Sequence, residues 1–167
     1  IIYKINKRKF NNNIELVNKD LVKNKIYKTL VDQDKDEYIF FLKELLQESD
    51  FKNIKILKEQ EIDMIGQKKN EGIAIKCFQY TYDHKVENNF DEFLMSIKSM
   101  KINKAMLITT SSFSEEIKKI TENFNENIKI DLVDMDGIIN MLRDSSMYPN
   151  KDKIKNMIIQ KLDDEKL

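Results

Sequence analysis

The sequence predicts an α/β fold in which a mixed central sheet carries helices on both faces, with elements in the order αβββαβαβα. Three observations lead to this class. Apolar residues recur at helical spacing after Asp34, and three short apolar segments then follow one another between polar stretches. A third observation is the continuous apolar run 106–108, which is typical of a parallel strand covered on both faces.

The first predicted helix begins after Asp34, whose side chain can accept a hydrogen bond from the first turn. Glu37 stands three residues later, in the manner of a capping box. The apolar stripe that carries the helix to about Glu48 consists of Tyr38, Phe41, Leu42 and Leu45. Core packing accounts for this stripe.

Three strands are predicted next, at 54–57, 61–65 and 73–80. The second and third read as a hairpin joined by the turn-like stretch 66–72. A second helix is expected from apolar residues at helical spacing: Val86, Phe90, Phe93, Leu94, Ile97 and Met100.

The second half of the chain alternates strand and helix. After the run 106–108, Ser114 is placed to cap a helix that starts at Glu115. A fifth strand is predicted at 128–133 and a short helix at 137–142. Pro149 then breaks the chain before a lone amphipathic helix, so we expect an N-terminal arm or linker at 1–33, a domain at 34–145 and a C-terminal helix at 146–167.

Composition bounds the class of protein. A chain of 167 residues fits one domain with a proper core. Its one cysteine, Cys77, excludes an internal disulfide and suits a reducing cytoplasm. With His84 as the single histidine, a zinc site lacks ligands.

Charge is distributed unevenly. The formal net charge is zero, from 29 basic and 29 acidic residues, which argues against a surface that tracks phosphates throughout. Residues 1–30, however, hold eight basic residues against two acidic ones. Lys7, Arg8 and Lys9 are therefore expected to contact DNA phosphates or a membrane surface, or to be solvated. The opening Ile-Ile-Tyr-Lys resembles the cytoplasmic exit of a spanning helix, which leaves open a membrane anchor upstream of residue 1 on a protein that is otherwise cytoplasmic.

The candidate chemistry lies on the predicted hairpin. Asp63 is followed 11 and 13 residues later by Ala74 and Lys76, which places an acid and an amine on adjacent strands. A charged side chain in an apolar strand is costly unless it is paired or binds something. Mutual pairing of Asp63 and Lys76 is the simpler interpretation, and a phosphodiester-cleaving site is the other.

Flanking segments favour the second interpretation. The passage 105–116, with Thr109-Thr110 and Phe113 before Ser114, resembles the strand-to-helix passage of Mrr-type restriction endonucleases. The segments 128–139 and 36–46 are similar to that family's next strand and opening helix, with Glu37 at a recurrent acidic position. The chain is therefore identified as a member of the Mrr branch of the PD-(D/E)xK nuclease superfamily, over about 35–142.

This resemblance implies metal-dependent hydrolysis of duplex DNA. It implies that Mg²⁺ or Mn²⁺ is held by Asp63, the carbonyl of Ile75 and Glu37, and that Lys76 positions the attacking water or stabilises the developing charge. Ala74 departs from the family pattern, because a methyl group stands where a Glu or Gln ligand is expected. Glu61 and Glu71 are the candidate substitutes.

Two other functions remain open. Ala74 favours a catalytically inactive nuclease-fold module that binds DNA or serves assembly. The first nine residues favour a membrane-tethered sensor. The final helix lies outside the family's minimum and leaves a homodimer open.

Overall fold

The computed structural model describes residues 18–58, 61–87, 90–123 and 127–166. Besides a helix over residues 18–32, the elements are α2 (Lys35–Glu48), β1 (Lys52–Ile56), β2 (Met64–Lys68), β3 (Glu71–Phe78), α3 (Asp91–Ser99), β4 (Lys104–Thr109), α4 (Glu115–Asn123), β5 (Lys129–Val133), α5 (Met135–Arg143) and α6 (Lys151–Glu165). The predicted α/β class and element order are confirmed. The helix over residues 18–32 precedes that order, where an arm or linker was expected, and α6 lies within the predicted C-terminal helix.

Two compact units divide the chain. Of the described residues, those between 30 and 147 form the larger one, and residues 18–29 with 148–166 belong to the other. The larger unit contains the whole sheet. Among the described residues, no helix combines the length and the hydropathy needed to cross a bilayer.

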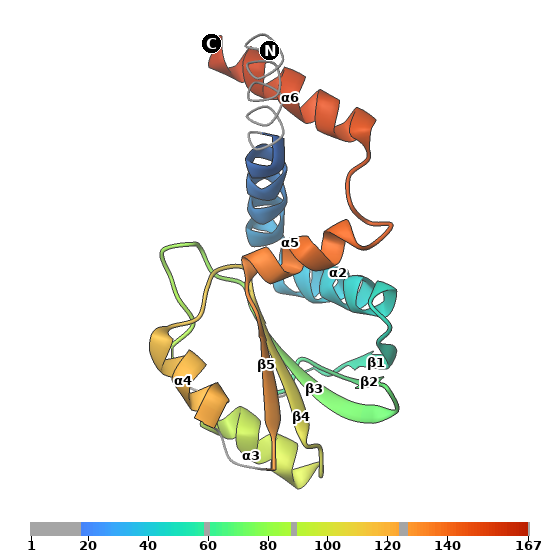
Figure 1. The fold of residues 1–167 in the computed structure, drawn as a ribbon, viewed down its shortest axis with the longest axis vertical. Coiled ribbons are helices and arrows are strands. Elements are labelled where there is room, and N and C mark those ends of the chain that lie inside the picture. Colours follow the sequence, from blue (N-terminus) through green and yellow to red (C-terminus); the bar gives the residue numbers. More distant parts are fainter. Residues whose placement is uncertain (1–17, 59–60, 88–89, 124–126, 167) are drawn as a thin grey trace, which may run out of the picture. The chain divides into compact units, whose positions relative to one another are not determined.

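The sheet is mixed and follows the sequence order β1-β2-β3-β4-β5. The pairs β1–β2 and β2–β3 are antiparallel, whereas β3–β4 and β4–β5 are parallel. Figure 1 shows α3 and α4 on one side of the sheet and α2 on the other. The parallel half needs these covering helices, since its strands are buried on both faces. In β4, all residues from Ala105 to Thr109 are buried.

The hairpin turn is shorter than predicted. Lys68 pairs with Glu71, so Lys69 and Asn70 alone make the turn, and both have positive φ angles of 51° and 65°. The predicted turn 66–72 is therefore wrong at both ends. Gly66 lies within β2, where a Cβ would come within 3.0 Å of the Ile54 side chain on β1. Close packing of two strands, rather than turning, explains this glycine.

Two other elements begin three or more residues later than predicted. The strand expected at 61–65 begins at Met64, so Asp63 immediately precedes β2. The helix expected from Val86 begins at Asp91. Val86 instead forms an isolated parallel bridge with Phe113, accepting from the Ser114 amide and donating to the Ser112 carbonyl. These bonds hold its backbone in an extended conformation.

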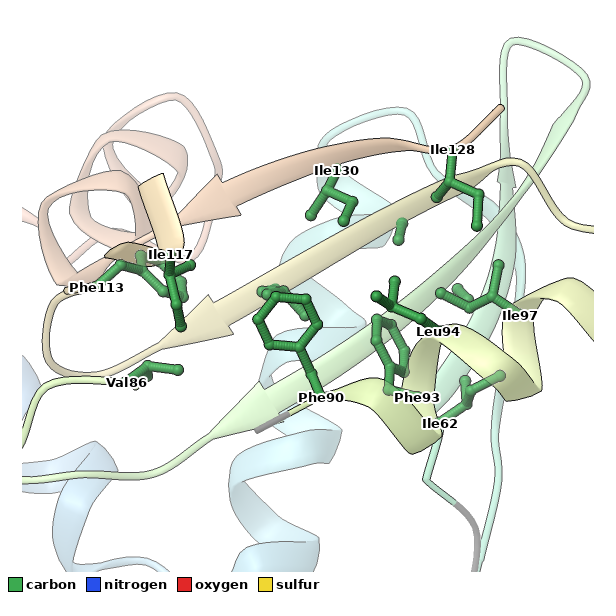
Figure 2. Close-up of a cluster of buried hydrophobic side chains, with 13 residues drawn as sticks. Ile62, Val86, Phe90, Phe93, Leu94, Ile97, Phe113, Ile117, Ile128 and Ile130 are labelled. Carbon is green, nitrogen blue, oxygen red and sulfur yellow. The ribbon is translucent and has the colours of Figure 1, made fainter. Parts of the chain in front are cut away.

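The core on the α3 and α4 side is apolar and closely built. Figure 2 shows Phe93 and Leu94 close to Ile97, and Ile117 next to Phe113, within one cluster beside the sheet. Ala74 and Leu107 belong to the same cluster, and neither is exposed. Because side chains alternate along a strand, Ile73, Ile75 and Cys77 of β3 face the opposite side, where α2 lies.

The predicted capping of α2 is confirmed at its N-cap. The Asp34 side chain accepts a hydrogen bond of 2.8 Å from the Glu37 amide. This bond fixes the first turn of the helix, which contains Lys35 and Tyr38.

We predict that Asp34→Ala lowers the free energy of unfolding by about 1 kcal/mol, because the Glu37 amide loses its partner. Thermal melting should fall by about 2–4 °C. Glu44→Ala, on the same helix, is the control and should leave the midpoint nearly unchanged. Equal melting of the two variants would contradict the assigned role of this cap.

Candidate active site

A cleft of about 530 Å³ opens beside the end of β3. It is lined by Lys35, Glu61, Asp63, Lys76, Cys77, Phe78, Gln79, Tyr80 and Glu87. The structure thus brings together Asp63, Lys76 and Glu61, which the sequence singled out. Its charged walls comprise two lysines and three carboxylates, so the formal charge of the cleft is −1.

Asp63 forms hydrogen bonds with β3 on both sides of Lys76. Its amide donates to the Ile75 carbonyl at 3.0 Å, and its carboxylate Oδ2 accepts from the Cys77 amide at 2.6 Å. The β2–β3 register ends with Met64 opposite Ile75, so the carboxylate serves Cys77 where β2 no longer supplies backbone. Burial raises the pKa of the Cys77 thiol, and the negative charge of Asp63 raises it further.

Lys76 is paired with Glu61 rather than with Asp63. Its Nζ lies 3.2 Å from Glu61 Oε2 and 3.1 Å from the Glu61 carbonyl. The hydrogen bond from Lys76 lowers the pKa of the Glu61 carboxyl, and the lysine charge lowers it further. This ion pair holds the lysine over the cleft.

Two residues of α2 donate hydrogen bonds to the same end of β3. Lys35 Nζ donates to the Cys77 carbonyl at 2.5 Å, and the Tyr38 hydroxyl donates to the Phe78 carbonyl at 2.9 Å. Burial raises the pKa of Tyr38, so its hydroxyl stays protonated as a donor. Sequence reasoning missed Lys35, since its partner is a backbone group distant in the chain.

Beyond β3, the chain is held by two more side chains. The buried Thr110 hydroxyl accepts from the Tyr80 amide at 2.8 Å and donates to the Tyr80 carbonyl at 2.7 Å. Gln79 donates to the carbonyls of Leu30 and Gln33, both at 2.7 Å. Gln79 therefore satisfies the end of the helix over residues 18–32.

Ala74 lies on the same face of β3 as Lys76, but other side chains enclose it. It is 0% exposed and packs within the apolar cluster that includes Ile62 and Phe93. A carboxylate at this position would enter hydrocarbon rather than the open cleft, at a cost of several kcal/mol. A single substitution at Ala74 would therefore not restore the missing ligand.

The other candidate residues lie elsewhere. Glu37 is exposed on the first turn of α2 and is not among the described residues that line the cleft. Glu71 starts β3, several residues before Lys76, and forms an ion pair with Lys104. Lys7, Arg8 and Lys9 lie outside the described residues.

Comparison with known proteins identifies the fold family. The Mrr_cat restriction endonuclease family model matches residues 32–142, about two-thirds of the chain. The chain belongs to the Mrr-type restriction endonuclease family. A search of curated proteins gives no match.

Two solved structures are similar to this Mrr-type domain. One is the DNA modification-dependent restriction endonuclease AspBHI, with 13% identity and a TM-score of 0.50 over 77% of this chain and 34% of that one. The other is AF1548, a protein of unknown function, with 24% identity and a TM-score of 0.47 over 63% of each chain. The AspBHI likeness supports the restriction-endonuclease-like fold. The chain spans less than two-thirds of either protein.

Mrr-type domains generally use divalent metals. A magnesium ion is commonly held by one or two carboxylates, with water and substrate phosphate completing the shell. Asp63 and Glu61 fit that requirement, since both carboxylates line one cleft. Among the described residues, no three His, Cys, Asp or Glu side chains gather into a metal site. A cation held by these two carboxylates would therefore need water or phosphate as its further ligands.

We predict that Thr110→Val lowers the free energy of unfolding by about 1–3 kcal/mol, because both backbone groups of Tyr80 lose their partner. Urea denaturation should show a lower midpoint with an unchanged slope. Thr121→Val is the matched control, since its hydroxyl bonds helix carbonyls of α4; we expect a change within about 0.5 kcal/mol. A similar loss in both variants would remove the special role of Thr110.

We also predict that Lys76→Met raises the pKa of Glu61 toward its ordinary value of 4.5, as the hydrogen bond and the charge are lost together. In the wild type the pair stabilises the folded chain above pH 4.5, and that contribution disappears as the pH falls through the lowered pKa.

Carboxyl-carbon NMR titration measures this shift. Lys104→Met is the matched control, because Lys104 lowers the pKa of Glu71 in the same way. Lys104→Met should raise the pKa of Glu71 and leave the pKa of Glu61 unchanged. A Glu61 titration insensitive to Lys76→Met would rule out the ion pair in solution.

Proposed function

We propose that this domain is a restriction-type endonuclease that hydrolyses phosphodiester bonds in duplex DNA with Mg²⁺ or Mn²⁺. The observation that carries the proposal is the convergence of Asp63, Lys76 and Glu61 on one cleft in a domain of this family. Duplex DNA is the substrate that the family suggests.

Asp63 would hold the cation through its carboxylate. The hydrogen bond that this carboxylate accepts from the Cys77 amide fixes its orientation. Glu61 would be the second carboxylate, in place of the side chain that Ala74 lacks. The Ile75 carbonyl would be a further oxygen ligand; it accepts from the Asp63 amide, and Ile75 is not among the described residues that line the cleft. The cation, when bound, supplies Lewis acidity beside the scissile phosphate.

Lys76 has two roles, one before DNA binds and one afterwards. Before DNA binds, Glu61 neutralises it at the cleft wall. An arriving phosphate competes for the same ammonium group, so Lys76 exchanges a carboxylate for the phosphate and Glu61 becomes available as a ligand. Lys76 then orients the attacking water or stabilises the charge that develops on the phosphate.

A specific observation favours a second function, a catalytically inactive module that binds DNA. Ala74 is fully enclosed by apolar side chains, and Asp63 and Lys76 each have a structural partner that explains their presence without catalysis. Under this alternative, DNA binds at the cleft and is not cut.

The test is plasmid cleavage with Mg²⁺ or Mn²⁺ by wild type and four variants. Asp63→Asn keeps an oxygen for the Cys77 amide while removing the charge, so it separates metal binding from folding. We expect Asp63→Asn and Lys76→Met each to reduce cleavage by about 100-fold or more. Glu61→Gln should also reduce it, whereas Glu71→Gln, the matched control at the start of β3, should not.

The outcomes separate the two functions. Duplex binding without cleavage by folded wild type would establish the inactive module. Cleavage that survives Asp63→Asn would contradict the assigned site. Equal effects of Glu61→Gln and Glu71→Gln would remove Glu61 as the second carboxylate. Melting curves for every variant confirm that the chain is folded.

A further inference from the structure

A row of aromatic rings leads away from Lys76. Its Nζ lies 5.8 Å from the ring centroid of Phe78. The Phe78 and Tyr80 centroids are 5.6 Å apart at an interplanar angle of 49°, and those of Tyr80 and His84 are 4.4 Å apart at 17°. Tyr80 and His84 thus form a nearly parallel stack that Phe78 connects to the candidate catalytic lysine.

The row begins in the cleft and ends at the surface. Phe78 and Tyr80 are half-buried and line the cleft, whereas His84 is exposed. A row that served only to pack the core would bury its last ring. The exposed position of His84 therefore makes the stack accessible to a planar ligand.

The stack is also held in place before any ligand arrives. Thr110 fixes both backbone groups of Tyr80, and the His84 amide donates to the Thr81 carbonyl at 2.9 Å. A preorganised aromatic surface loses little conformational entropy when a ligand stacks on it.

Charge alone does not make this cleft attractive to a nucleic acid, because its formal charge is −1. One divalent cation at Asp63 would reverse that charge to +1. Aromatic rings add an uncharged contact, and every nucleobase has a π face that can stack on them. In a duplex, neighbouring bases cover those faces, so a free face requires an unpaired nucleotide.

We propose that the Tyr80–His84 stack seats an unpaired base next to the phosphate held at Lys76. The substrate class is then duplex DNA in which at least one nucleotide beside the scissile bond is unpaired. This inference rests on the proposed function for the position of that phosphate, and it goes further by naming the state of the DNA.

The test compares two fluorescent single strands of about 12 nucleotides, oligo(dT) and an abasic strand with the same phosphates, by anisotropy. Ca²⁺ replaces Mg²⁺, since it also takes oxygen ligands, and gels verify that the strands stay intact. We expect wild type to bind oligo(dT) at least about fivefold more tightly than the abasic strand, which corresponds to about 1 kcal/mol.

Three variants assign the effect. His84→Ala should abolish the preference for oligo(dT) and leave abasic binding nearly unchanged. His84→Phe should retain the preference, because a flat ring remains. Phe40→Ala is the control, since Phe40 is an exposed aromatic residue of α2, 53% accessible, outside the row.

Equal wild-type affinity for the two strands, or no binding to either, would overturn the inference. A loss in His84→Ala that affects both strands equally would also overturn it, because it would indicate a role in charge or folding. Failure to cleave both a plasmid and a duplex that contains unpaired nucleotides, with the oligo(dT) preference intact, would remove the endonuclease proposal alone. Cleavage without the preference would remove the stacking platform alone.

Discussion

Side chains satisfy much of the backbone at the end of β3, beside the bonds that β4 supplies, and the arrangement of the site follows from that constraint. β2 supplies backbone partners only as far as Ile75, whereas the chain continues to Tyr80. Asp63 serves the Cys77 amide, Lys35 the Cys77 carbonyl, Tyr38 the Phe78 carbonyl and Thr110 both groups of Tyr80. An unpaired buried amide or carbonyl costs about 1–3 kcal/mol, so these five hydrogen bonds stabilise the fold. They converge on the strand that presents Lys76.

Local signals were sufficient to predict most of the fold. Helical spacing after Asp34, the apolar run before Thr109 and the capping residue Ser114 each specify one element without knowledge of its neighbours. The errors arose where tertiary contacts decide. Gly66 reads as a turn residue, yet its place is set by the side chain of Ile54 on another strand. Val86 continues a helical pattern, but its backbone bonds the loop before α4.

The candidate site was predictable in part. Asp63 and Lys76 could be selected by spacing, and the structure places both in one cleft. The pairing of Lys76 with Glu61 rather than Asp63 depends on the path of the chain before β2, which no periodicity encodes. The aromatic row had a visible signal, since Lys76, Phe78 and Tyr80 alternate along the strand and must share a face. His84 had none, because its ring reaches Tyr80 through a turn.

Asp63 has consequences for how relatives of this chain are judged. Its carboxylate completes the backbone pairing of β3, so selection for a stable fold would retain an acid or amide here even after cleavage had been lost. Lys76 likewise has a partner that does not depend on catalysis, since Glu61 pairs with it at the cleft wall. Decay of catalysis in this lineage need not erase the recognisable motif. A survey that identifies active family members from Asp63 and Lys76 alone would therefore count inactive proteins as enzymes.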